Sequence, residues 1–174
     1  MKEKFAKFYM DVAYRTAQLS YAQRLKVGCL VVKNDRIISL GFNGTPSGWD
    51  NTCEDRVYMP GDAGGWLSPE EIYQSWPLVD EHGARYKLVT KQEVLHSEMN
   101  ALMKLAKSTD SGEGATMFIT HAPCINCAKA IYQAGITEVI YDNDYRSADG
   151  IYFLKKCGMS INKLAERTTT KPTI

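Results

Sequence analysis

The sequence has no long hydrophobic run, no large excess of charge of either sign and no even set of cysteines. Its apolar stretches fall well short of the roughly 18 residues that a membrane-spanning helix needs, and its charged first residues are unlike a signal peptide. The 21 Lys and Arg against 20 Asp and Glu leave a formal net charge of +1, so no overall field favours a long nucleic acid or an anionic membrane. We therefore expect a cytoplasmic protein that binds neither.

Five cysteines are an odd number in a chain without an export signal, which argues against a disulfide framework and for reduced thiols that can hold a metal. These cysteines are Cys29, Cys53, Cys124, Cys127 and Cys157. With 174 residues, of which 44% are hydrophobic, the chain is long enough to bury a substantial core. We predict a single domain over 1–166, followed by a flexible polar tail over 167–174.

Hydrophobic periodicity predicts that helices and strands alternate along most of the chain. The opening helix is expected over 2–19, and its apolar residues at helical spacing are Phe5, Phe8, Tyr9, Val12, Ala13, Thr16 and Leu19. Short β-branched runs at 27–32 and 36–42 flank a turn-forming triplet, which predicts an antiparallel hairpin. Later helices are expected at 96–107, 123–135 and 148–157, and strands at 115–120, 136–142 and 159–164. This order indicates an α/β fold, a three-layer α/β/α sandwich around a mixed five-stranded sheet.

The segment at about 43–90 is rich in residues that interrupt regular structure. It holds all three tryptophans and four prolines, which are Pro46, Pro60, Pro69 and Pro77. We expect an irregular insertion with one short helix from Ser68, where Ser-Pro-Glu-Glu resembles a helix cap with proline at the first position. So long a loop inside a compact domain is usually functional, as a lid or a binding segment.

Two short segments hold the residue types of a catalytic zinc site, His96-Ser97-Glu98 and Pro123-Cys124-Ile125-Asn126-Cys127. Such a site has three protein ligands and leaves its fourth position open for water. Cys124 and Cys127 are three residues apart, so on a helix they share a face and can bind one ion. A helix N-terminus and a zinc ion both lower the pKa of a thiol, so both cysteines are expected to bind as thiolates. His96, Cys124 and Cys127 are therefore the predicted ligands of one zinc per chain.

Glu98 lies two residues beyond His96 and is predicted to move protons as the catalytic residue, since a carboxylate beside the water of such a site can take up its proton. Two other interpretations of C-x-x-C are a structural zinc ribbon and a redox motif. A ribbon needs a second cysteine pair, which Cys29, Cys53 and Cys157 do not form. A redox motif would make the presence of the H-x-E segment a coincidence.

The pairing of H-x-E with P-C-x-x-C resembles the signature of the zinc-dependent cytidine and deoxycytidylate (dCMP) deaminase superfamily, and more closely its deoxycytidylate deaminases. The resemblance extends from about Phe5 to Lys163. It also depends on the segments Arg24-Leu25-Lys26-Val27-Gly28 and Gly41 to Gly48, and on the tryptophan-containing insertion. It implies the cytidine deaminase-like fold and zinc-dependent hydrolytic deamination of dCMP to dUMP and ammonia, which supplies dUMP for thymidylate synthesis.

The resemblance also assigns residues to the substrate. It implies that Arg24 and Lys26 bind the 5′-phosphate, as cations can by charge-assisted hydrogen bonds. It places Asn43 at the deoxyribose, Tyr145 against the substrate and Ser97 close to the base. Ordinary solvated charges and a packed aromatic ring are the alternative interpretations at these positions.

A regulatory nucleotide is implied as well. The loop that binds it in the family corresponds to Gly41, Phe42, Asn43, Gly44 and Thr45. A glycine-rich turn presents backbone N–H groups to phosphates, although on the sequence alone this segment is a plain tight turn. The resemblance further implies activation by dCTP, inhibition by dTTP, a magnesium ion with the effector, and a homohexamer.

Some residues depart from the family pattern. Ser97 stands where alanine is usual, Ala122 where serine is more common, and Phe42 where tyrosine is usual. Some phage members carry a second, structural zinc, for which Cys53 and His82 are the only candidate remnants here. We assign no second zinc.

Three alternative functions stay open. A tRNA adenosine deaminase shares both zinc segments, but its polyanionic substrate favours a basic surface, whereas the net charge here is +1. A deaminase that also accepts dCTP would need a looser phosphate pocket. A non-catalytic, zinc-stabilised binding module is the alternative from a different class.

Overall fold

The computed structural model describes residues 1–62 and 65–164, which form two compact units. The larger unit consists of residues 1–20, 26–44 and 95 onward, and the smaller unit of residues 21–25 and 45–94. The tail predicted at 167–174 lies outside the described residues. Within the described ranges, no helix combines the length and the apolar character needed to cross a membrane.

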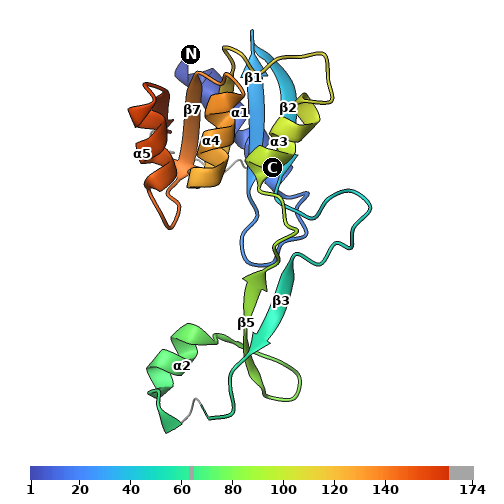
Figure 1. Cartoon of the computed structure of the whole chain (residues 1–174), viewed down its shortest axis with the longest axis vertical. Helices are drawn as coiled ribbons and strands as arrows, with labels where there is room; N and C mark the ends of the chain where they lie inside the picture. Colours follow the sequence, from blue (N-terminus) through green and yellow to red (C-terminus); the bar gives the residue numbers. More distant parts are fainter. Residues whose placement is uncertain (63–64, 165–174) are drawn as a thin grey trace. The chain divides into compact units, whose positions relative to one another are not determined.

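The larger unit is built on a mixed five-stranded sheet with the strand order β2-β1-β6-β7-β8, of which β2, β1 and β7 are labelled in Figure 1. β1 (Gly28–Lys33) pairs antiparallel with both β2 (Arg36–Phe42) and β6 (Thr116–His121). β7 (Glu138–Asn143) and β8 (Ser160–Lys163) continue the sheet parallel to β6. The predicted hairpin and the predicted sheet are both confirmed.

Alternation along the strands separates the core of the larger unit into two layers. In β1, Cys29 and Val31 belong to one apolar cluster, while Leu30 and Val32 belong to the other. α1 (Glu3–Ala17) contributes to the Leu30 cluster. α3 (Ser97–Leu105), α4 (Ile125–Gln133) and α5 (Asp149–Lys156) contribute to the Cys29 cluster. The sheet is therefore covered by helices on both faces, as a three-layer sandwich requires.

The buried face of α1 differs from the predicted one. Phe5, Phe8 and Leu19, which were expected to face the core, are 43%, 55% and 57% exposed. The residues that α1 does bury are Ala6, Tyr9, Met10, Ala13, Thr16 and Ala17. The physical reason is close approach, since a Cβ at Gly28 of β1 would lie 2.2 Å from the Ala13 carbonyl oxygen. Only small side chains fit where Ala13 and Ala17 meet Gly28, so these alanines set the orientation of the helix and the Phe5 and Phe8 rings lie on its exposed side.

The smaller unit contains regular structure where an irregular insertion was predicted. Its strands β3 (Glu54–Tyr58), β5 (Arg85–Thr90) and β4 (Leu78–Val79) form an antiparallel sheet in the order β3-β5-β4. The prediction missed these strands because they are short and carry charged residues in place of a clear apolar alternation. The predicted helix is present as α2 (Pro69–Ser75), with Ser68 as its cap.

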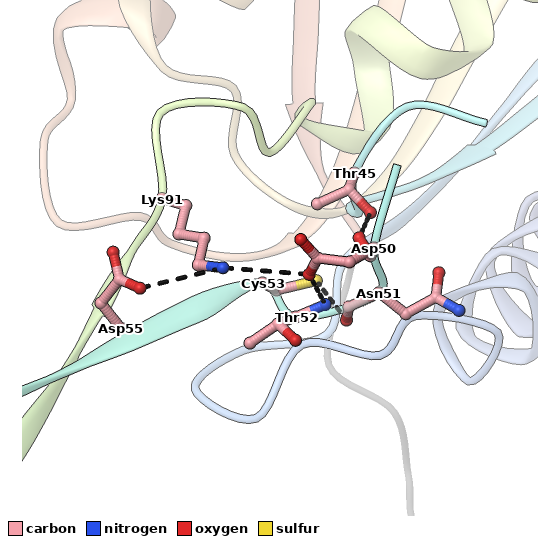
Figure 2. A network of polar contacts seen from close by, with 7 residues as sticks. All are labelled: Thr45, Asp50, Asn51, Thr52, Cys53, Asp55 and Lys91. Carbon is pink, nitrogen blue, oxygen red and sulfur yellow. Dashed lines mark hydrogen bonds and ion pairs between the residues drawn. The ribbon is translucent and has the colours of Figure 1, made fainter. Parts of the chain in front are cut away.

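Ion pairs and hydrogen bonds join the loop before β3 to the end of β5. The Lys91 ammonium lies 3.9 Å from a carboxylate oxygen of Asp50 and 3.8 Å from one of Asp55 (Figure 2). Asp50 Oδ1 also accepts a hydrogen bond from the Thr52 N–H, and the Thr45 hydroxyl donates to the Asp50 carbonyl oxygen at 2.6 Å. The loop before β3 is thus tied to the residue that follows β5.

Candidate active site

The three predicted metal ligands meet where two helices of the larger unit begin. His96 is the N-cap residue of α3, Cys124 is the N-cap residue of α4, and Cys127 lies one turn further along α4. His96 Nδ1 is 3.5 Å from Cys124 Sγ and 3.4 Å from Cys127 Sγ. The three ligand atoms lie within 4.8 Å of one another, and among the residues that the structure describes they form the one such group.

These separations fit one tetrahedral zinc ion. With Zn–S bonds of about 2.3 Å and Zn–N bonds of about 2.0–2.1 Å, tetrahedral geometry places a sulfur and a nitrogen ligand about 3.5 Å apart. The two Sγ–Nδ1 distances of 3.5 and 3.4 Å agree with that value. Three protein ligands also leave one coordination position for water, as in catalytic zinc sites. His96, Cys124 and Cys127 are therefore the residues that would hold a zinc ion.

The ligand side chains are linked by hydrogen bonds that separate their pKa values. The pKa of Cys124 is lowered to about 3, because Cys127 and His96 both hydrogen-bond to its sulfur. The pKa of Cys127 is raised by its hydrogen bond to Cys124 and by burial. The bond to Cys124 also raises the pKa of His96. Zinc ligands must be deprotonated, so zinc binding displaces the proton that Cys127 holds.

Glu98 lies beside these ligands and is only 4% exposed. Burial raises the pKa of its carboxyl, while its own backbone N–H and the Ser97 hydroxyl lower it. Its charge contributes to the raised pKa of Cys127, which places the two side chains close together. A buried carboxylate next to an open metal position is well placed to accept a proton and return it.

Two glycines allow other elements to approach the two segments that carry the ligands. A Cβ at Gly41 of β2 would lie 2.1 Å from the Ser97 carbonyl oxygen, and one at Gly150 of α5 would lie 2.0 Å from the Pro123 carbonyl oxygen. The Cys29 thiol donates to the same Ser97 oxygen at 3.1 Å. These roles could not be predicted from the sequence, because no local signal marks contacts between residues so far apart along the chain.

A chain of hydrogen bonds joins α1 to the carboxyl ends of β6 and β7. Asn143 Nδ2 donates to the Thr120 carbonyl oxygen at 2.9 Å and to the Tyr14 hydroxyl at 2.6 Å, and Tyr14 donates to Asp142 Oδ2 at 2.7 Å. The Thr120 hydroxyl lies 3.2 Å from His121 Nδ1. Ligands of open α/β sheets bind beyond the carboxyl ends of the strands. His121 thus contacts the Thr120 hydroxyl and does not belong to the group formed by His96, Cys124 and Cys127.

The two predicted phosphate ligands belong to different units. Lys26 is exposed in the larger unit, and Arg24 is exposed in the smaller one. The Arg24 guanidinium donates to the Thr90 hydroxyl at 3.3 Å. The backbone N–H groups of Gln23 and Arg24 donate to the buried Glu54 carboxylate at 3.1–3.3 Å. The segment that carries Arg24 is therefore anchored to β3 by Glu54, a residue that the sequence reasoning did not single out.

The residues assigned to a regulatory nucleotide make hydrogen bonds within the chain. The Asn43 N–H donates to the Val27 carbonyl oxygen, and Asn43 Oδ1 accepts from the Val27 N–H at 2.8 Å. The Gly44 N–H donates to the Leu95 carbonyl oxygen. Phe42 pairs with Gly28 in the sheet. The backbone N–H groups of Asn43 and Gly44, which were expected to face a phosphate, are therefore already paired with carbonyl oxygens of the protein.

Tyr145 follows β7 and is half-buried. The Arg146 guanidinium lies 5.4 Å from the centre of its ring, within the range of a cation–π contact. Ser97, which was assigned near the base, is completely buried, and its hydroxyl donates to Glu98 Oε2 at 2.8 Å.

A two-sided α/β sandwich with a His-Cys-Cys group and a buried glutamate defines a hydrolytic zinc enzyme of the deaminase type. The family description "Cytidine and deoxycytidylate deaminase zinc-binding region" matches residues 3–143. The chain belongs to this cytidine and deoxycytidylate deaminase family.

Relatives from phage and human support the same assignment. The chain is 34% identical to deoxycytidylate deaminase of Enterobacteria phage T4 over 152 residues, which cover 78% of this chain and 76% of the relative. It is 34% identical to the Homo sapiens deoxycytidylate deaminase over 149 residues, with 84% and 69% covered. A crystal structure of dCMP deaminase from the cyanophage S-TIM5 in complex with dCMP and dUMP superposes with a TM-score of 0.73 at 39% identity, covering 94% of this chain and 98% of that one.

Proposed function

We propose that the protein hydrolyses dCMP to dUMP and ammonia. The observation that carries the reaction is the His96, Cys124 and Cys127 group with the buried Glu98 carboxylate beside it. The substrate is proposed from relatives that are named deoxycytidylate deaminases and from the cyanophage enzyme, which was crystallised with dCMP and dUMP. The product would supply thymidylate synthesis.

A bound zinc supplies Lewis acidity, which lowers the pKa of a water ligand from about 15.7 toward about 7. The remaining chemistry is that of Glu98. Its carboxylate takes one proton from the attacking water and delivers it to ring nitrogen N3 of the cytosine. It then transfers the second proton of that water to the amino group at C4, which leaves as ammonia. Burial favours this proton transfer, because it raises the pKa of Glu98 and so brings the protonated and ionised carboxyl closer in free energy at neutral pH.

The residues proposed for the nucleotide are Arg24 and Lys26 at the 5′-phosphate, Asn43 at the deoxyribose, and Tyr145 against the substrate. The anchoring of Arg24 by Glu54 and Thr90 supports a fixed role for this residue over that of a mobile surface charge. Arg24→Ala and Lys26→Ala should each raise KM for dCMP while leaving deoxycytidine turnover unchanged. Lys2→Ala, which removes a cation at the exposed start of the chain, is the control.

Regulation is the part of the proposal that depends on family resemblance alone. It comprises activation by dCTP, inhibition by dTTP and a magnesium ion with the effector at residues 41–45. A homohexamer is proposed on the same ground, whereas a cytoplasmic location is proposed because the sequence has no apolar run long enough to span a membrane. A flat kinetic response to dCTP and dTTP, with and without magnesium, would remove the effector site from the proposal. Sedimentation would test the hexamer.

An ammonia-release assay on zinc-loaded protein tests the function directly. The panel is dCMP, dCTP, deoxycytidine and a tRNA anticodon stem, with dCMP expected to be turned over most efficiently. Appreciable release from dCTP would indicate a looser phosphate pocket, and release from the tRNA stem alone would contradict the substrate assignment. A tRNA A34 deaminase shares the fold, with a TM-score of 0.52 at 16% identity. If Glu98→Gln binds zinc but loses ammonia release, the binding-module alternative is excluded.

A further inference from the structure

The residue between the histidine ligand and the glutamate has a polar contact of its own. Ser97 is 0% exposed, and its hydroxyl donates to Glu98 Oε2 at 2.8 Å. Neighbouring residues of a helix point in different directions, so adjacent side chains meet only if one of them folds back along the helix. The Glu98 side chain is therefore folded toward the start of α3, where the metal ligand His96 lies.

Residues of β1 and β2 hold the backbone of Ser97, whose hydroxyl is the donor. The Ser97 carbonyl oxygen accepts the Cys29 thiol at 3.1 Å. The close approach of Gly41 to the same oxygen leaves no room for the first turn of α3 to shift toward β2. Ser97 thus presents its hydroxyl from a backbone that two strands fix in place. A rigid donor can preorganise the group that it contacts.

We propose that Ser97 is a positioning residue that assigns the two carboxylate oxygens of Glu98 to different tasks. This inference rests on the proposed role of Glu98. The hydrogen bond from the Ser97 hydroxyl lowers the basicity of Oε2 and fixes the carboxylate, so Oε1 is the oxygen that takes the proton from water and gives it up again. Both transfers then use one oxygen in a fixed orientation, and Glu98 need not rotate between them. An alanine at this position would lack this hydrogen bond.

The proposal is tested by Ser97→Ala and Ser97→Thr in zinc-loaded protein. Ser97→Ala removes the donor and should lower kcat by about tenfold, because a misoriented proton carrier loses part of its contribution. KM for dCMP and the zinc content should stay within about twofold of wild type, because neither depends on the donor in this proposal. Ser97→Thr keeps a hydroxyl and should restore most of the rate.

Ser39→Ala is the matched control. The buried Ser39 hydroxyl on β2 donates to the Ala101 carbonyl oxygen of the same helix at 2.7 Å. Its loss disturbs α3 without touching Glu98, so kcat should hardly change. A double-mutant cycle adds a second criterion, since Ser97→Ala should have no further effect on the residual rate of Glu98→Gln. An equal kcat loss in Ser39→Ala, or a full Ser97→Ala effect in the Glu98→Gln background, would overturn the proposal.

A readout without substrate separates this inference from the proposed function. In a crystal structure of zinc-bound Ser97→Ala, Glu98 should adopt more than one side-chain rotamer, whereas the wild type and Ser97→Thr keep one. An unchanged, single Glu98 rotamer in Ser97→Ala would overturn the inference. An inactive wild type with this rotamer pattern would contradict the proposed function and leave the positioning role of Ser97 standing.

Discussion

The two units of this chain are stabilised by different kinds of interaction. The larger unit buries two apolar clusters, one on each face of its sheet, and its core strand β1 is almost entirely enclosed. In the described part of the smaller unit, the buried residues are Ala22, Cys53 and Glu54. Its sheet is held by ion pairs, a helix cap and cation–π contacts, such as Arg85 over the Tyr73 ring at 3.9 Å.

The difference shows where each kind of function can be placed. The candidate metal group and Glu98 need fixed geometry, and they lie in the unit whose backbone segments approach closely and whose helices contribute to apolar clusters. A segment held by polar contacts has few buried apolar groups, so its opening costs less free energy than that of a core. We therefore expect a rigid reaction centre in the larger unit and a smaller unit that opens locally. Substitutions in both units test this contrast.

Glu98→Gln should produce the largest loss of activity. Removal of a general acid–base group typically lowers kcat by about 100- to 10,000-fold. The zinc content should stay at that of wild type, because the glutamine leaves His96, Cys124 and Cys127 unchanged. Ammonia release from dCMP and metal analysis on the same sample measure both quantities. A variant that keeps more than a tenth of the wild-type rate would contradict the proton-transfer role.

The same substitution should stabilise the metal-free protein at neutral and higher pH. Burial raises the pKa of Glu98 above its ordinary value of 4.5, so the folded state holds this proton more tightly than the unfolded state. Stability contributed by this proton is complete below that ordinary value and falls as the pH rises through the folded-state pKa. Glutamine does not ionise, so the variant should melt at a higher temperature than wild type at pH 8. The gap should shrink toward pH 5, and a gap that is independent of pH would contradict this account.

Leu154→Ala tests the core of the larger unit. Leu154 is 0% exposed within the Cys29 cluster, and such truncations cost about 2–5 kcal/mol of unfolding free energy. Val79→Ala is the counterpart in the smaller unit, where Val79 is 50% exposed on β4 and the expected cost is below about 0.5 kcal/mol. Urea unfolding of both variants measures the difference. Equal losses of unfolding free energy in the two variants would contradict the proposed difference between the two units.

Glu54→Leu removes the one carboxylate that is buried among the described residues of the smaller unit. Its Oε1 accepts from both the Gln23 and Arg24 N–H groups and its Oε2 from the Gln23 N–H as well, whereas a leucine side chain offers neither donor an acceptor. A buried donor without its partner costs about 1–3 kcal/mol, so exchange of these two amide protons should accelerate about tenfold or more. Asp55→Asn, at the neighbouring exposed position, is the control and should leave both amides unchanged. An acceleration that spreads through the larger unit would show that the opening is not local.

Ser68→Ala should have a smaller effect than Glu54→Leu. The Ser68 hydroxyl accepts from the Glu71 N–H, and the Glu71 carboxylate accepts from the Ser68 N–H, which together form a capping box. Loss of such a cap costs about 1 kcal/mol, which should appear as faster amide exchange within α2. Ser75→Ala, at the last residue of the helix, removes a hydroxyl of the same size without a capping role. Equal effects of the two variants would argue against the cap.

Features that depend on local spacing were predicted well. The H-x-E and C-x-x-C segments predict their ligand group because three residues along a helix return a side chain to the same face. Ser68 and Pro69 predict the start of α2 because capping is settled within one turn. The strands of the larger unit were found because their apolar runs are strong. The exposed aromatic residues of α1 and the small sheet were predicted incorrectly, because close packing and cross-strand pairing decide them.

Local spacing was enough to predict the chemistry of this protein, since one imidazole, two thiols and one carboxylate at these spacings admit few other uses. The orientation of these groups depends on contacts between distant segments. Cys29 and Gly41 come from strands far along the chain, yet they fix the backbone of Ser97, whose hydroxyl holds Glu98. Spacing along a helix is set by local geometry, whereas the contact between a strand and the start of a helix exists only once the whole sheet has formed.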